Sequence, residues 1–286
     1  MRPAPSQPLL PVASVRSQPA RVASAVAIAA LLCAGVAGAL DGQSLRLLLL
    51  GAQDMSTPQT MLRADATVTV ETPKGTRTTE AIALFAPGKE ARWYLQVREP
   101  ALAALVLGSE RKVMERSGRT TQTLAIGAPA GDLGFAYEDL SRFVADDFTG
   151  WQITDESPTT VLAGAPPAVE SAYVYRAYTL DKERTLAVKV QYYARTLNNL
   201  VKLRTDAAHV LLGRKWLPGT VRIENFAEGS TTTLALRWTQ NASAPPELLT
   251  PAGFAAAPAL PWVSSPAAGA APATPALSPI ATDRPR

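Results

Sequence analysis

The stretch "VRIENFAEGSTTTLALRW", residues 221–238, decides the fold because it reads as two β-strands joined by a tight turn. Apolar residues occupy every second position on both sides of the turn: Val221, Ile223, Leu234 and Leu236. Glu228-Gly229 supplies the turn between them. Alternation with a period of two is typical of antiparallel strands that bury one face and expose the other. The segment therefore predicts a β-hairpin.

The same alternation recurs along the chain, for example in "ARWYLQVRE" (residues 91–99) and "TLAVKVQYYA" (residues 185–194). We expect about ten strands between Thr60 and Trp238. Helical patterns are confined to residues 43–52, a turn at residues 100–104 and the segment at residues 133–143. Because helices do not alternate with strands, the sequence predicts a mainly β (α+β) domain on an antiparallel sheet.

Charge and composition argue against a nucleic-acid-binding protein. Hydrophobic residues make up 47% of the 286 residues and charged residues 18%, with a formal net charge of +4. Three arginines and no acidic residue lie in residues 1–39, so the remainder carries 25 basic and 24 acidic residues. The excess of positive charge therefore belongs to the N-terminus, and the rest of the chain lacks the basic surface that nucleic acid requires.

The N-terminus has the pattern of an export signal. Residues 1–20 read as disordered, and residues 22–40 form an apolar run that ends in the A-x-A motif, with cleavage expected after Ala39. An uncleaved inner-membrane anchor formed by residues 22–40 is the alternative. The single cysteine, Cys33, lies inside this run, so a cleaved chain has no thiol for a disulfide or a metal site.

The C-terminus changes composition after Phe254. Residues 255–286 are rich in alanine and proline and read as a disordered tail. The expected organisation is a signal peptide at residues 1–39, one domain at residues 40–254 and this tail.

The sequence offers no recognisable catalytic set. There is no G-x-S-x-G motif, and the only histidine, His209, reads as a loop or strand-end residue. One histidine and no mature cysteine argue against a zinc site, and we expect no cofactor. Asp146-Asp147 lacks the spaced acids of a calcium loop.

Two adjacent carboxylates in "LGFAYEDLSRF", residues 133–143, pose the question of a catalytic acid pair. Neighbouring residues on a helix point about 100° apart, so Glu138 and Asp139 would not converge on one substrate atom. We expect them to begin a short amphipathic helix and to face water or its N-terminal amides. The apolar edge of that helix would then cover the sheet.

The segment "GDLGFAYEDLSRF", residues 131–143, resembles the G-S-D-F-[ST]-Y-E-D-L signature of the outer-membrane lipoprotein-sorting proteins of the LolA-like superfamily. Other motifs follow in the expected order, including the strand with W-[LY]-Y at residues 91–97 and the N-x-x-x-G-x-x-T-x-L hairpin at residues 225–234. The resemblance covers about residues 55–254. Departures lie at Leu133-Gly134 and in the turn at residues 195–198.

The resemblance implies one curved antiparallel sheet, an incomplete β-barrel whose open concave side is covered by short helices. It also implies an apolar cavity for acyl chains. Candidate lining residues, each of which has ordinary core packing as its alternative, are Trp93, Leu95, Val97, Phe135, Tyr137, Leu140 and Phe143.

The resulting functional hypothesis is a monomeric periplasmic carrier of lipid or lipoprotein acyl chains. Its partners would be an inner-membrane permease of the RND or MMPL type and an outer-membrane acceptor. The alternative is a periplasmic lipid or lipoprotein sensor, or an envelope-assembly factor acting through protein contacts. An enzyme using Glu138/Asp139 or Asp146/Asp147 is a third, less favoured reading.

Overall fold

The structure is a computed structural model and describes residues 42–262. The expected export signal with Ala39 and Cys33, and the part of the expected tail from residue 263 onward, lie outside the described residues. Within residues 42–262, no helix combines the length and the apolar character needed to cross a membrane.

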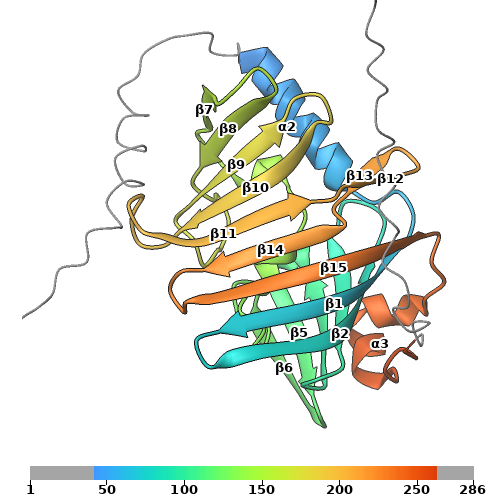
Figure 1. Cartoon of the computed structure of the whole chain (residues 1–286). Helices are drawn as coiled ribbons and strands as arrows, with labels where there is room; N and C mark the ends of the chain where they lie inside the picture. The colour runs from blue at the N-terminus through green and yellow to red at the C-terminus, as the bar shows by residue number, and fades with distance from the viewer. Residues whose placement is uncertain (1–41, 263–286) are drawn as a thin grey trace, which may run out of the picture.

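The described chain begins with helix α2 (Gly42–Ser56), which extends the helix expected at residues 43–52, and continues mainly as strands (Figure 1). The strands are β1 (Leu62–Thr72), β2 (Gly75–Phe85), β3 (Arg92–Val97), β4 (Leu102–Leu107), β5 (Lys112–Ser117), β6 (Thr120–Ala125), β7 (Gln152–Asp155), β8 (Thr160–Ala165), β9 (Tyr175–Asp181), β10 (Leu186–Tyr193), β11 (Leu200–Ala207), β12 (Val210–Leu212), β13 (Lys215–Leu217), β14 (Thr220–Asn225) and β15 (Ser230–Gln240). The 3-10 turns are η1 (Gly108–Glu110), η2 (Tyr137–Leu140), η3 (Ala145–Asp147) and η4 (Pro246–Leu249), and α3 (Pro251–Ala256) follows η4.

Thirteen of these strands form one antiparallel sheet in the order β6-β5-β4-β3-β2-β1-β15-β14-β11-β10-β9-β8-β7. The hairpin predicted at residues 221–238 is β14 and β15, with Asn225 opposite Ser230 at the turn. The expected turn at residues 100–104 was wrong in part, because Leu102 already begins strand β4. The sheet curves without closing, so the expected mainly β, incomplete-barrel fold is confirmed.

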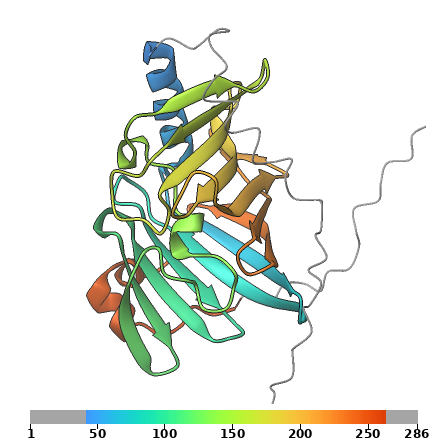
Figure 2. The same cartoon turned by 90° about the vertical axis from the view of Figure 1, so that its left-hand side faces the viewer.

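The connection between β6 and β7 is the feature that sets the architecture. These two strands are at opposite edges of the sheet, although they are consecutive in sequence. Residues 126–151, the crossover segment, must therefore run from one edge to the other. They do so across the concave face, where Figure 2 shows them in green in front of the strands.

The concave face buries two apolar clusters, one in each half of the sheet. In the first, Leu133, Phe135 and Tyr137 of the crossover segment pack on strands β1 to β5, β14 and β15. In the second, Phe143 and Phe148 pack with α2 and strands β8 to β10. The crossover segment thus contributes to both cores, which ties the two halves of the sheet together.

The short helix expected at residues 133–143 was wrong in extent, since only the η2 turn is helical. Gly134 shows the reason: its φ of +76° lies in the left-handed region, which an ordinary helix excludes. A Cβ at this position would meet Thr232 Oγ1 at 2.8 Å, so the chain passes too close to β15 for any larger residue.

A third cluster covers the convex face of strands β2 to β5 with the C-terminal segment, and it corrects the expected domain end at residue 254. Leu260 is 8% exposed, and its backbone N–H and C=O bond the amide of the buried Gln96 side chain at 2.7 and 2.9 Å. Trp262 stacks on the guanidinium of Arg98 at 4.7 Å. Residues 255–262 are therefore part of the folded domain. The convex face of these strands is apolar, as the concave face is, and residues 255–262 shield it from water.

Ending the chain after Phe254 is expected to lower the free energy of unfolding by about 3 kcal/mol, because Leu260 burial is lost and Gln96 loses both hydrogen bonds to Leu260. Urea unfolding measures this against the matched chain that ends after Trp262, which keeps these contacts. Equal stability of the two chains would contradict this assignment of the domain boundary.

Candidate functional site

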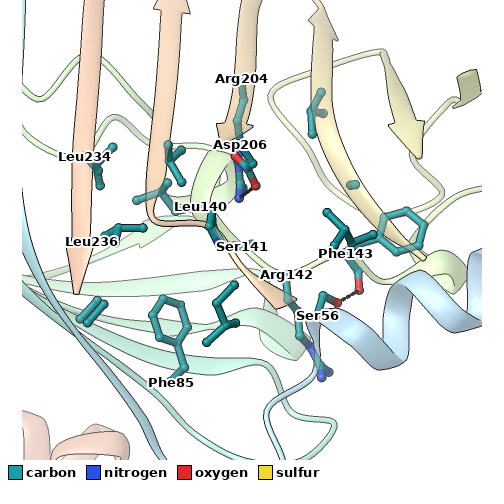
Figure 3. A pocket seen from close by; sticks show the side chains of 18 of the residues that line it. Ser56, Phe85, Leu140, Ser141, Arg142, Phe143, Arg204, Asp206, Leu234 and Leu236 are labelled. Atoms are coloured by element: carbon teal, nitrogen blue, oxygen red, sulfur yellow. Dashed lines mark hydrogen bonds and ion pairs between the residues drawn. The ribbon is translucent and has the colours of Figure 1, made fainter. Parts of the chain in front are cut away.

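A pocket lies in the concave face, enclosed by the middle of the sheet, the C-terminal end of α2 and the crossover segment (Figure 3). Its volume is about 180 Å³. The floor consists of four alanines that face each other across β1 and β2, with Ala64 opposite Ala83 and Ala66 opposite Ala81. Side chains that end at Cβ leave space that larger core residues would fill, so the alanines create the hollow.

Aromatic side chains form the wall beside this floor. The Phe85 ring lies 5.7 Å from the Trp93 ring and 5.5 Å from the Trp238 ring, measured between centroids. Trp238 is fixed in place by donating its Nε1–H to the carbonyl of Pro218 at 2.7 Å. These rings present a continuous apolar surface to the pocket.

The roof of the pocket is the cover, residues 140–143 of the crossover segment, in which Leu140 lies over the first cluster. Arg142 holds the cover to the loop after β2 and to the end of α2. Its guanidinium donates to Thr57 Oγ1 and to the carbonyl of Gly88, both at 3.0 Å, and to the carbonyl of Lys89. Burial lowers the pKa of Arg142 from its ordinary value.

Helix α2 makes the second attachment of the cover. Ser56 Oγ donates to the carbonyl of Phe143 at 3.0 Å, as Figure 3 shows. Gln53 Oε1, one turn earlier, accepts the backbone N–H of Ala145 at 2.8 Å. Both contacts use polar groups on the face of α2 that meets the crossover segment.

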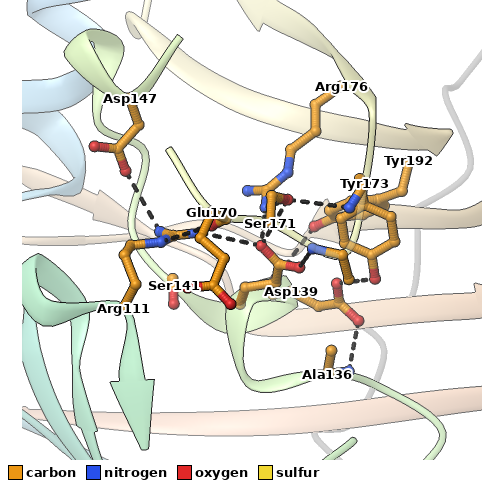
Figure 4. A network of polar contacts seen from close by, with 12 residues as sticks. Arg111, Ala136, Asp139, Ser141, Asp147, Glu170, Ser171, Tyr173, Arg176 and Tyr192 are labelled. Carbon is orange, nitrogen blue, oxygen red and sulfur yellow. Dashed lines mark hydrogen bonds and ion pairs between the residues drawn. The ribbon is translucent and has the colours of Figure 1, made fainter. Parts of the chain in front are cut away.

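Glu138 anchors the crossover segment to the second half of the sheet, and its partners Arg111, Ser171 and Arg176 are labelled in Figure 4. Its carboxylate accepts hydrogen bonds from the guanidinium of Arg176, from Arg111 Nη2 at 3.2 Å, from Ser171 Oγ at 3.0 Å and from the backbone N–H of Ala172 at 2.8 Å. The Glu138 side chain is 0% exposed. A buried carboxylate with this many donors is fully satisfied.

Asp139 makes the neighbouring anchor. One carboxylate oxygen accepts from Tyr173 Oη at 2.5 Å, and the other accepts from Lys202 Nζ at 2.8 Å and from the backbone N–H of Ala136 at 2.7 Å. Its carbonyl accepts from Arg204 Nη1 at 2.7 Å. Burial and the Asp139 charge raise the pKa of Tyr173, which keeps its hydroxyl a donor.

These contacts correct the expectation that Glu138 and Asp139 face water. Asp139 does accept the amide that precedes η2, but both side chains are buried because the facing strands supply cations for them. Each of the four carboxylate oxygens is engaged by the protein itself. The pair therefore acts as an anchor, and its geometry gives no support to the acid–base reading.

Comparison with known proteins supports the architecture. A family profile described as "Uncharacterized protein" matches residues 130–252. Among solved structures, a putative outer-membrane lipoprotein-sorting protein domain from Vibrio parahaemolyticus superposes with a TM-score of 0.61 at 17% identity, covering 72% of this chain and 97% of that one. A LolA superfamily protein from Nitrosomonas europaea gives 0.58 at 13% identity, covering 72% and 96%.

A DUF1329 family protein from Desulfovibrio piger superposes with a TM-score of 0.60 at 14% identity, covering 72% of this chain and 97% of that one. Comparison with curated proteins finds no match by sequence. The chain has the LolA-like fold. At these identities the likeness concerns the fold alone.

On this LolA-like scaffold, the residues predicted to line the cavity divide into two groups. Four of them line the pocket: Trp93, Leu95, Leu140 and Phe143. The other three lie in the adjoining first cluster: Val97, Phe135 and Tyr137. Tyr137 is fully buried and its hydroxyl donates to Glu115 at 2.5 Å, so it supports the cover from the side of β5.

Two parts of the pocket were missed by the sequence reasoning. The alanine floor was visible as small residues at every second position, Ala64 and Ala66 in one strand and Ala81 and Ala83 in the next, but a single strand does not show that they pair. Four polar residues of the lining gave no sequence signal, because they come from β9, β11 and a strand-end loop: Arg176, Arg204, Asp206 and His209.

Among residues 42–262 there is no group of three or more histidine, cysteine or acidic side chains placed to hold a metal ion. Asp147, one of the two acids considered for a cation site, has its Oδ2 atom 3.6 Å from Arg111 Nη1. Burial raises the pKa of Asp147. His209 follows β11, as expected for a strand-end residue, and it also lines the pocket. The pocket therefore has a largely apolar lining with a few polar groups.

Replacing Glu138 by glutamine is expected to lower the free energy of unfolding by about 3 kcal/mol, because Arg176 is left as an uncompensated buried charge. The matched control is Asp132→Asn, which removes the exposed partner of Arg77 and should cost less than about 1 kcal/mol. Chemical denaturation of both variants checks this, and a Glu138 variant as stable as the control would show that the anchor is dispensable.

His209 is expected to make the fold less stable in mild acid. Burial holds its pKa below the ordinary value of 6.5, so the unfolded chain takes up a proton before the folded chain does. The free energy of unfolding should then fall as the pH drops below about 6.5 and through the lower folded value. It is the chain's only histidine, so His209→Gln should flatten this part of the stability profile. Identical profiles for the two proteins between pH 7.5 and pH 5.5 would refute the assignment.

Proposed function

We propose that this protein is a periplasmic carrier that binds the acyl chain of a lipid or lipoprotein between the alanine floor and the cover. The observation that supports this most directly is the hollow itself. A core of this size is normally filled by side chains, whereas here Ala64, Ala83 and Leu140 line a space that no side chain fills.

The size of the pocket limits what it holds while the cover is in place. An apolar cavity of 150 Å³ takes one benzene molecule, so about 180 Å³ accommodates roughly seven carbon atoms of a chain by the same measure. At about 0.8 kcal/mol per buried methylene, such a segment contributes roughly 5–6 kcal/mol before the cost of ordering it. A longer chain requires the cover to move outward.

The attachments of the cover suit a part that moves as a unit. On one side the buried ion pairs of Glu138 and Asp139 fix it to the sheet. On the other side it is held by the hydrogen bonds of Arg142 and Ser56 to neutral groups. The second set costs less to break, because it contains no ion pair, whereas separating Glu138 or Asp139 from its partners leaves buried charges unpaired. Entry of the chain between the cover and α2 is therefore the route we propose.

Export and partners belong to the same proposal. The apolar run at residues 22–40, cleaved near Ala39 or kept as an inner-membrane anchor, would deliver the domain to the periplasm. One structural neighbour is described as a putative outer-membrane lipoprotein-sorting protein domain, which supports a role in carrying acyl chains between membranes. An inner-membrane permease and an outer-membrane acceptor would be its partners, and no catalytic step is proposed.

The protein purified from its native envelope without detergent is expected to carry lipid that mass spectrometry of an organic extract detects. Ala83→Leu should abolish this lipid while leaving the fold stable, because the larger side chain fills the floor of the pocket with apolar atoms. Leu140→Asp should also reduce it, because a carboxylate in the cover is unfavourable beside a hydrocarbon.

Leu211→Asp is the matched control for the cover variant, since Leu211 is 56% exposed and lies outside the pocket. This variant should retain the lipid of the wild type. If the wild-type extract contains no lipid and the protein binds no fluorescent fatty acid, the carrier function is wrong.

A further inference from the structure

One end of the pocket differs in chemistry from the rest. The floor and the aromatic wall are apolar, but Arg204 and Asp206 of β11 and His209 in the turn after it also line the space. Figure 3 shows Arg204 and Asp206 together on the strand, beside Leu140 of the cover. We call these three residues the polar end.

The two charged members of the polar end neutralise each other. Arg204 Nε and Nη2 donate to the two carboxylate oxygens of Asp206, each at 2.7 Å, in the two-point geometry that pairs a guanidinium with a carboxylate. The remaining Nη1 donates to the carbonyl of Asp139. Arg204 therefore has its charge compensated and its strongest donors occupied, so this end is a weak receptor for an anion.

His209 is the member that lacks a partner. Its Nε2 atom is buried and has no hydrogen-bond partner among the described residues. Burial lowers the pKa of its imidazole, against the opposite effects of Asp206 and Asp181, so the ring is neutral at neutral pH. The other charged groups around it are Arg184 and Arg204. A neutral imidazole offers one donor and one acceptor, and a buried polar atom left unpaired costs about 1–3 kcal/mol.

We propose that the carried molecule joins its hydrocarbon chain to a neutral hydrogen-bonding group, a hydroxyl or an ester carbonyl, and that this group binds His209 Nε2 at the polar end. The inference rests on the proposed carrier function and adds the chemical class of the ligand. A free carboxylate would instead meet Asp206 and an already compensated Arg204, so it is disfavoured at this position.

Trp93 provides a second unpaired polar atom in the lining. It is 3% exposed, and its Nε1–H has no acceptor among the described residues. An indole N–H can only donate, so it also suits a ligand that carries a neutral acceptor such as an ester oxygen. Trp93 lies on β3 and His209 in the turn after β11, so they provide separate contacts for one amphiphile.

The test uses three probes with the same eight-carbon chain: octan-1-ol, octanoate at pH 8 and 1-chlorooctane. Tryptophan fluorescence reports binding, because Trp93, Trp216 and Trp238 all line the pocket. We expect wild-type protein to bind octan-1-ol at least about tenfold more tightly than octanoate. His209→Leu should weaken octan-1-ol about tenfold and leave 1-chlorooctane unchanged, and His209→Gln should restore most of the loss, because it keeps a hydrogen-bonding group there.

The outcomes separate this inference from the function on which it rests. If no probe binds wild-type protein, the carrier function and this inference both fail. If His209→Leu weakens octan-1-ol and 1-chlorooctane equally, or changes neither, His209 does not bind the polar group of the ligand. Either result overturns the inference while the carrier function stands. Tighter binding of octanoate than of octan-1-ol would also overturn it, and would direct attention to the guanidinium of Arg142.

Discussion

Two buried carboxylates hold the crossover segment across the concave face, and the pocket depends on them. Strands β6 and β7 lie at opposite edges of the sheet, so the chain has to return over its own open side. Glu138 pairs with Arg176 and Arg111 there, and Asp139 pairs with Lys202. Without these pairs, five charges would be buried unpaired or forced into water, and the cover would lose its fixed height above the sheet.

The hollow persists because its two sides are set by different parts of the chain. The floor is fixed by the ladder of β1 and β2, where alanines oppose alanines over two successive pairs of the same face. The roof is fixed by ion pairs to the far half of the sheet and by hydrogen bonds to α2. Neither side can collapse onto the other without breaking backbone ladders or buried polar contacts, which cost more than the dispersion energy that closure would gain.

The sequence predicted the antiparallel sheet well, because alternation at Val221, Ile223, Trp93 and Leu95 reports directly on which face of a strand is buried. It predicted the burial of the convex face poorly. The alternation in residues 91–99 puts Tyr94 on the face opposite Trp93, the face that such a pattern exposes. Tyr94 is nevertheless fully buried under Phe254, because the C-terminal segment folds back over β3. A local period of two cannot show that a distant segment covers the other face.

The site was predictable only in its apolar part, for a related reason. Trp93 and Leu140 were found from strand alternation and from a motif, which are local signals. Of the two cationic partners of Glu138, Arg111 lies in the turn before β5 and Arg176 lies in β9. Only the fold brings them to Glu138. The carboxylates were therefore expected to face water or the N-terminal amides of their own helix, the default for an acid without a visible counter-charge.

The most direct test of the central claim is a crystal structure of the protein purified from its native envelope without detergent or delipidation. The account predicts elongated density without polar branches beside Ala64 and Ala83, beneath Leu140, in a space that the protein's own side chains leave open. Density showing that space closed by inward movement of Leu140 and Phe85, with nothing bound, would contradict it.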